Sequence, residues 1–385
     1  MSIDLSALRR RLHRYPELSN QEFQTSQFIR DLFSEHFDPD EILQLGGHGL
    51  AFVFNGHEPG PTVMLRADMD ALPIHEVNTF EHRSQNEGVS HKCGHDGHMT
   101  ILAGVAEKLA ENRPQCGRVV LVYQPAEETG DGARAIVEDP EFSRVRPDYV
   151  FALHNVPGYP EHQIQCRTGV FSTAVRSMIV HFRGKTAHSA KPYMGINPGM
   201  AVAELIRHGE KVYNNAPPGA VCALVYTEMG ERSYGVAAGH AEIAFQLRAY
   251  TDSELQDLWD QMSNTAHELG EQYGLGIDFS RGEEFVANTN DAEAVEIIRQ
   301  AAEDTGLVYH DMPEPNPWGE DFGTFNANFT GAMFTLGAGE DRPDLHNPDY
   351  DFNDDIIPTG VNMFTHLITR ALALPRRQNA SGQAA

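Results

Sequence analysis

The chain has 385 residues, of which 41% are hydrophobic, and its formal net charge at pH 7 is −26. This length exceeds one ordinary hydrophobic core and predicts two domains, and no stretch is long and apolar enough for a membrane span. The excess of acidic side chains argues against a nucleic-acid partner, because polyanions bind to cationic surfaces.

The N-terminal part has the pattern of helices followed by strands. From Leu5 to about Phe37 apolar residues recur at helical spacing, with an interruption near Tyr15. Two short β-branched and aromatic runs, 51–55 and 61–65, then predict strands. The second run leads directly into Asp68 and Asp70, which we expect to orient a ligating imidazole or to cap a loop.

A group of potential metal ligands opens the next predicted helix. The segment Cys93–His98 (CGHDGH) follows a polar stretch, and apolar residues at helical spacing extend to Leu109. His95 and His98 are therefore predicted at or just before a helix N-terminus. Cys93 and His95 offer a thiolate and an imidazole that one or two metals could share, although a buried cysteine beside a capping histidine remains an alternative. We expect His98 to be a packing or hydrogen-bonding residue and exclude it from the ligand set.

Further polar residues follow predicted buried strands. Glu127 and Glu128 follow the strand 119–123, His154 follows 149–153, and His346 lies in the loop after 332–336. Because ligands of open α/β sheets bind beyond the carboxyl ends of strands, these residues are expected at one edge. One acid of the pair could bind metal while the other takes a proton from water and passes it to the leaving amine.

The middle of the chain has a different pattern. Between Arg176 and about Glu284 the order strand, helix, strand, strand, helix, strand indicates a small α+β layer on an antiparallel sheet. The α/β pattern resumes with the predicted helix Ala292–Thr305, so this layer is expected to be an insertion. The tail Asn379–Ala385 is predicted to be disordered.

Four motifs occur in order along the chain: Arg66–Pro73 (RADMDALP), His91–His98 (HKCGHDGH), Gln124–Glu128 (QPAEE) and Gly319–Phe322 (GEDF). Together they resemble the motifs of the di-metal amidohydrolases that include hippurate hydrolase, indole-3-acetyl-amino-acid hydrolase and N-acetyl-diaminopimelate deacetylase, which are relatives of aminoacylase. The similarity spans nearly the whole chain.

The resemblance implies a ligand set and a catalytic residue. Two divalent cations, Mn²⁺ or Zn²⁺, would be held by five residues, with Glu127 as the general base and acid. The donor set does not decide between these metals. The five implied ligands are Cys93, His95, Glu128, His154 and His346.

The resemblance also assigns two residues in the middle region. His188 would polarise the substrate carbonyl, in relatives often across a dimer interface, and Arg248 would clamp the substrate carboxylate through its bidentate fork. Without the resemblance both residues would be taken as surface residues. Where relatives usually carry a substrate-binding asparagine, this chain has Gly235, so the preferred substrate cannot be carried over from relatives.

These observations together predict an α/β catalytic domain with a phosphorylase/hydrolase-like mixed sheet, formed by residues 1–175 and 285–385, and an inserted α+β satellite domain for dimerisation or as a lid, residues 176–284. The expected function is hydrolysis of the acyl bond of N-acyl amino acids or similar small amides by a homodimer. The alternatives are a metallopeptidase acting on dipeptides and a non-catalytic metal-binding dimerisation protein. Four cysteines at scattered spacings, with no signal peptide, predict a cytoplasmic location without nucleic-acid or membrane partners.

Overall fold

The structure is a computed structural model that describes residues 3–375. It divides into two compact units. The first joins the N-terminal part up to Phe171 with Thr289–Glu314 and with the residues from Asp321 onward, and the second consists of Ser172–Asn288 and Pro315–Glu320. The predicted middle region, 176–284, lies inside the second unit and does not include its short segment 315–320.

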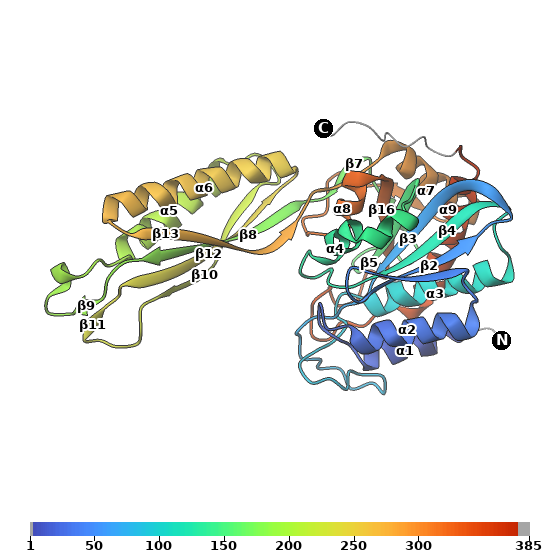
Figure 1. Ribbon diagram of the computed structural model, residues 1–385, viewed down its shortest axis with the longest axis horizontal. Coiled ribbons are helices and arrows are strands. Elements are labelled where there is room, and N and C mark those ends of the chain that lie inside the picture. The colour runs from blue at the N-terminus through green and yellow to red at the C-terminus, as the bar shows by residue number, and fades with distance from the viewer. Residues whose placement is uncertain (1–2, 376–385) are drawn as a thin grey trace. The chain divides into compact units, whose positions relative to one another are not determined.

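An eight-stranded mixed sheet forms the centre of the first unit (Figure 1), with the order β1-β2-β4-β3-β5-β16-β6-β15. Its central strands β4, β3, β5 and β16 are parallel to one another, whereas β2 and β6 run antiparallel to their central neighbours. This confirms the predicted mixed α/β sheet. The strands are β1 Glu41–Leu45, β2 Gly49–Asn55, β3 Glu58–Asp68, β4 Cys116–Gln124, β5 Tyr149–Val156, β6 Ile164–Cys166, β15 Tyr309–Asp311 and β16 Thr330–Gly337.

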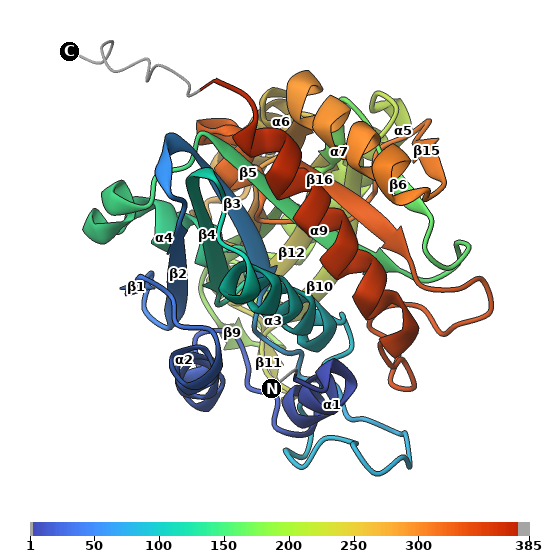
Figure 2. The ribbon, with the colours of Figure 1, turned by 90° about the vertical axis from the view of Figure 1, so that its right-hand side faces the viewer.

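Helices cover both faces of this sheet. Figure 2 shows α1, α3, α7 and α9 in front of one face, and Figure 1 shows α4 and α8 on the other. The core between α3, α9 and the sheet is built from fully buried aliphatic and aromatic side chains. The helices are α1 Leu5–Arg14, α2 Phe23–His36, α3 His95–Glu111, α4 Gly132–Glu138, α7 Ala292–Thr305, α8 Gly323–Asn328 and α9 Ile357–Leu372.

The second unit is a four-stranded antiparallel sheet with two helices. Its strand order is β10-β12-β8-β13, and its core lies between the sheet and α5 and α6. Thr251 and Glu254 form a capping box that starts α6, and Gly274 ends the helix with a left-handed φ of 69°. The elements are β8 Ala174–Arg183, α5 Gly199–Asn215, β10 Val221–Met229, β12 His240–Ala249, α6 Asp252–Tyr273 and β13 Gly276–Phe285.

Two small ribbons complete the secondary structure: β9 Ala187–His188 pairs with β11 Val236–Ala237, and β7 Gly169–Ser172 pairs with β14 Asn288–Asn290. Within residues 3–375, no helix combines the length and apolar character needed to cross a bilayer. The tail predicted to be disordered, 379–385, lies outside the described residues.

Candidate metal centre

The parallel strands bring the predicted site residues of the first unit to one edge of the sheet. β3 and β4 end at Asp68 and Gln124, so the residues that follow them emerge side by side. His95 is the first residue of α3, as predicted. His154 was predicted to follow its strand, but β5 continues through it to Val156 because the parallel pairing with β16 extends that far.

Six side chains converge here, and Cys93 is at their centre. Its Sγ lies 3.4 Å from Nε2 of His154 and 3.4 Å from Nε2 of His346. The sets Cys93–His95–His154 and Cys93–Glu128–His346 each have all three donor atoms within 4.8 Å of one another. Two sets of three donor residues that share the thiol of Cys93 can hold two metal ions. The six converging residues are Cys93, His95, Glu127, Glu128, His154 and His346.

Two buried atoms of this cluster test whether a cation fits. Within residues 3–375, Nε2 of His95 and Oε1 of Glu128 are buried, have no hydrogen-bond partner and lie 3.8 Å apart. Buried polar atoms are rarely left unsatisfied. Nδ1 of His95 donates to the carbonyl oxygen of Asp70 at 2.9 Å, which leaves Nε2 as the ligating nitrogen. A divalent cation suits this donor set of thiol, imidazoles and carboxylates.

The electrostatics of the cluster also favour a cation. Burial would lower the pKa of His95, but the negative charges of Asp68, Asp70 and Glu128 raise it to about 10. Burial raises the pKa of Glu128, and the charges of Asp70 and Asp68 raise it further. The site therefore carries an excess of acidic groups. Burial keeps His154 neutral by lowering its pKa well below 6.5, and a neutral imidazole is the form that binds metal.

Asp68 and His98 form hydrogen bonds that link the elements carrying the predicted ligands. Nδ1 of His98 contacts Oδ1 of Asp68 at 2.7 Å, and its Nε2 contacts Oδ1 of Asn155 at 2.6 Å. Both ring nitrogens are engaged, as expected for a hydrogen-bonding residue. Nδ2 of Asn155 donates to the hydroxyl of Tyr350 at 2.5 Å, so this chain joins α3 and β5 to the segment that follows His346.

Gly94 lies between Cys93 and His95 and permits their spacing. Its φ is 95°, and a Cβ there would lie 2.4 Å from Oδ1 of Asn155. We expect Gly94→Ala to reduce metal affinity about 10- to 100-fold, because strain and the clash displace both neighbouring ligands. Isothermal titration of the apo-protein with Zn²⁺ or Mn²⁺ measures this.

Gly88 provides the matched control for that variant. Its φ is 77°, and a Cβ there would have nothing within 4 Å. Gly88→Ala introduces similar backbone strain away from the ligands and is expected to keep the affinity of the wild type. Equal metal affinities of the two variants would contradict the role given to Gly94.

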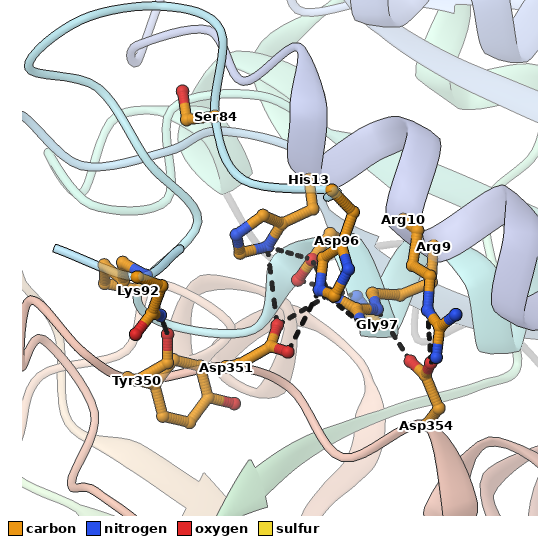
Figure 3. Close-up of polar contacts among 12 residues, drawn as sticks. Arg9, Arg10, His13, Ser84, Lys92, Asp96, Gly97, Tyr350, Asp351 and Asp354 are labelled. Atoms are coloured by element: carbon orange, nitrogen blue, oxygen red, sulfur yellow. Dashed lines mark hydrogen bonds and ion pairs between the residues drawn. The ribbon is translucent and has the colours of Figure 1, made fainter. Parts of the chain in front are cut away.

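A buried ionic network, shown in Figure 3, anchors the ligand segments to α1. Nδ1 of His13 contacts Asp96 at 2.8 Å, beside His95, and its Nε2 contacts Glu76 at 2.9 Å. Nζ of Lys92, beside Cys93, donates to Glu76 at 2.5 Å and to the carbonyl of Tyr350 at 2.7 Å.

The same network reaches the segment that carries the last predicted ligand. The backbone N–H of His346 donates to the carbonyl oxygen of Lys92 at 2.7 Å. Arg9, which is 1% exposed, pairs with Asp96, Asp351 and Asp354. His13, Glu76 and Arg9 were not predicted from the sequence, since only their tertiary contacts distinguish them from surface charges of a helix and a loop.

The charge of His13 predicts a pH dependence of stability. Burial opposes its charge, but hydrogen bonds to Asp96 and Glu76 raise its pKa from 6.5 to about 9. A raised folded-state pKa gives stability that is complete below pH 6.5 and is lost as the pH rises through 9. We expect the free energy of unfolding to fall by on the order of 3 kcal/mol between these limits.

Urea unfolding at a series of pH values between 6.5 and 9.5 checks this window. His13→Gln supplies the control, because it removes the titrating ring while Arg9 and Lys92 still neutralise the two acids. A wild-type stability that is flat over this range, or a slope that persists in His13→Gln, would contradict the prediction.

The remaining predicted site residues, His188 and Arg248, lie in the second unit. His188 is exposed on β9, and its Nδ1 accepts from the backbone N–H of Ala190 at 3.0 Å. Arg248 is on β12 and donates to the carbonyl of Pro317 at 2.8 Å and to Oε1 of Gln246 at 2.8 Å. Their roles toward substrate stay predictions.

Known proteins are similar to the chain over nearly its full length. The model of peptidase family M20/M25/M40 matches residues 64–370. An N-acetyldiaminopimelate deacetylase from Oceanobacillus iheyensis is 29% identical over 96% of this chain and 100% of its own length. One from Listeria innocua is 29% identical over 94% of this chain and 98% of its own. A solved dinuclear metal-binding peptidase of the M20 family from Bacillus subtilis superimposes with a TM-score of 0.80 at 27% identity, covering 96% of this chain and 98% of its own.

Proposed function

This chain belongs to peptidase family M20/M25/M40 and is an amide-bond hydrolase, and we propose that it removes the acyl group from N-acyl amino acids. The observation that carries the proposal is the convergence of six side chains at one sheet edge, with Glu127 beside two three-residue donor sets. The deacetylase relatives act, by their names, on an N-acetyl amino acid, which supports the substrate class.

We propose that two divalent cations, Mn²⁺ or Zn²⁺, bind in this centre. His95 and His154 would hold one, Glu128 and His346 the other, and the Cys93 thiolate would serve both sets. Such cations polarise a carbonyl oxygen and lower the pKa of water. The support for this assignment is the shared thiol together with the buried, unpartnered atoms of His95 and Glu128 among the described residues.

Glu127 is proposed to move the proton. Glu127 is 6% exposed, and its Oε2 lies 3.9 Å from Nε2 of His95. From this position Oε2 accepts a proton from the attacking water and returns it to the amide nitrogen of the leaving amino acid. Adjacent side chains at a sheet edge point in different directions, so Glu128 can bind a cation while Glu127 faces the water.

The second unit is proposed to be an inserted satellite domain that contributes to substrate binding. His188 would donate a hydrogen bond to the developing oxyanion, and Arg248 would bind the substrate carboxylate through two parallel hydrogen bonds. Gly235, which has no neighbours at its Cβ position, stands where the family's substrate-binding asparagine is expected.

A substrate panel on metal-reconstituted protein tests the proposal. N-acetyl amino acids, including N-acetyldiaminopimelate, are compared with N-benzoyl amino acids and free dipeptides. Hydrolysis of N-acyl substrates at higher kcat/KM than dipeptides supports the proposal. Preference for dipeptides favours the second candidate, a peptidase, which the name of the Bacillus subtilis relative supports. If the protein hydrolyses neither the N-acyl amino acids nor the dipeptides, both candidate functions are contradicted.

We also propose a homodimer formed through the second unit. β10 is an edge strand, and Leu224, Val225 and Met229 on it are 43%, 57% and 47% exposed. Exposed apolar residues on an open edge are typical of an interface between chains. A cytoplasmic location is proposed as well, because reducing surroundings keep Cys93 and the other three cysteines as free thiols.

Val225→Glu is expected to convert the dimer to a monomer in sedimentation velocity, because it places a charge in the apolar edge. Val308→Glu is the matched control: Val308 is 65% exposed but lies in the first unit, and its replacement should leave the dimer intact. A wild-type chain that sediments as a monomer at micromolar concentration would contradict the proposal.

A further inference from the structure

The turn that presents Glu127 begins with a backbone conformation that L-amino acids rarely adopt. Ala126 has a φ of 53°, in the left-handed region, directly before Glu127. Its carbonyl oxygen accepts from the N–H groups of Asp131 and Gly132, and the carbonyl of Glu127 accepts from Gly130 at 2.8 Å. A non-glycine residue in this region persists only where surrounding contacts enforce it.

Two buried carboxylates hold the backbone on either side of Glu127. Oε1 of Glu22 accepts from the N–H of Ala126 at 2.8 Å, and Oδ2 of Asp70 accepts from the N–H of Glu128 at 3.0 Å. Both acids are fully buried. The general base of the proposed reaction therefore lies between two backbone groups that are each fixed by an ionisable side chain from another segment.

Capping of α2 does not explain the burial of Glu22. It immediately precedes α2, yet its side chain makes no capping hydrogen bond with the described residues of that helix. Glu17 does this instead, by accepting from the N–H groups of Gln24 and Thr25. The second oxygen of Glu22, Oε2, has no hydrogen-bond partner within residues 3–375. Burying a carboxylate is costly, and among the backbone groups that stabilise its charge the N–H of Ala126 is the one in the turn that carries Glu127, so that contact is expected to matter.

We propose that Glu22 is a positioning residue for Glu127: its hydrogen bond to the N–H of Ala126 fixes the left-handed turn that directs the Glu127 carboxylate toward the substrate. This inference rests on the proposed function, because it assigns a purpose to Glu22 only if Glu127 transfers the proton. Glu22 belongs to none of the metal-donor sets found among the described residues.

Three substitutions separate the hydrogen bond from the charge. Glu22→Gln keeps an oxygen acceptor at the right distance without the charge, and is expected to retain kcat within about threefold. Glu22→Asp keeps the charge but shortens the side chain by one methylene, and Glu22→Leu removes the acceptor. For both we expect kcat to fall roughly 10- to 100-fold, because small misplacements of a catalytic group have effects of this size.

The substrate KM and the metal content distinguish a positioning role from a merely structural one. General damage to the fold would change both quantities together with kcat, whereas misplacement of Glu127 lowers kcat alone. In Glu22→Asp and Glu22→Leu, KM and the two-metal stoichiometry are expected to match the wild type, since the ligands are not moved. Glu17→Leu is the matched control: it removes the carboxylate that caps α2 and should lower Tm without changing kcat. Circular dichroism verifies folding, and if Glu22→Leu does not fold, Glu22→Asp decides the question.

The proposal is overturned if Glu22→Asp and Glu22→Leu retain kcat within threefold, if Glu22→Gln is as impaired as they are, or if Glu17→Leu loses kcat equally. These outcomes leave the proposed function standing, provided that the wild type hydrolyses N-acyl amino acids and Glu127→Gln does not. A wild type without amide hydrolysis refutes the proposed function and, with it, the role of Glu22.

Discussion

Replacing Glu127 with glutamine is expected to lower kcat about 10²- to 10⁴-fold, the usual contribution of a general acid–base group. The amide has nearly the same shape as the carboxylate but can neither accept the proton of water nor return it to the leaving nitrogen. Steady-state kinetics with the best substrate of the panel measures this loss. Metal content, measured by mass spectrometry on the same preparation, is expected to stay at two ions per chain.

Glu128→Gln is the matched control, because it makes the same chemical change one residue further along. Glu128 belongs to a donor set with Cys93 and His346, so its replacement should lower metal affinity, and added metal should partly restore activity. Substantial turnover by Glu127→Gln, or a loss of activity that excess metal repairs, would contradict the assignment of Glu127 as the proton carrier.

Arg66→Met is expected to lower the free energy of unfolding by about 3–5 kcal/mol, the cost of leaving buried charges without their partner. Arg66 is fully buried and donates to Asp68 at 2.6 Å and to Asp321 at 2.8 Å. Although burial alone would raise the pKa of Asp68, the nearby charges of His95 and Arg66 hold it well below 3.8. Without the guanidinium, both acids lose a charged partner inside the sheet. Urea unfolding at pH 7 measures the effect.

Arg113→Met provides the comparison for that measurement. Arg113 pairs with Asp40 at 2.9 Å, but 21% of the arginine and 42% of the aspartate side chain are exposed, so solvent screens the pair. Its replacement should have a much smaller effect. If the two variants lose similar stability, the buried charges around Arg66 are not what holds this part of the fold together.

The long elements of the fold could be predicted because their residues carry a periodic pattern. The helix Ala292–Thr305 has the predicted bounds, and the apolar runs 119–123, 149–153 and 332–336 all lie in central strands. The strands β1, β6 and β15 were missed, since they are short and lie toward the edges of the sheet. Their pairing depends on neighbours far away in the sequence rather than on a local pattern.

Helical spacing alone did not identify the buried face of α2. Phe23, which lies within the segment of helical apolar spacing from Leu5 to about Phe37, is 62% exposed, whereas Phe33 is fully buried and stacks on Phe52 of β2. Which apolar residues of an amphipathic helix face the core depends on where the helix is placed against the sheet. That placement is set by tertiary packing.

The residues of the candidate site that follow strands or open a helix could be predicted, whereas the buried residues that hold them in place could not. Residues that follow strands or open a helix could be expected at one edge, and the structure brings the six predicted side chains of the first unit together there. Glu22 and His13 gave no such signal, because a glutamate before a helix and a histidine within one are ordinary surface residues. Only the tertiary structure shows them buried against the turn at Ala126 and against Asp96.

The order of the strands has a consequence for how the protein is made. β16, in the centre of the sheet, and His346 come after the second unit in the sequence, whereas the other five converging residues precede it. During synthesis the N-terminal half leaves the ribosome with β3 available to pair with β5, but β16, the other neighbour of β5, is made only after the second unit has been translated. The donor set Cys93–Glu128–His346 can therefore assemble only after the second unit has been translated, whereas all three residues of the set Cys93–His95–His154 precede that unit.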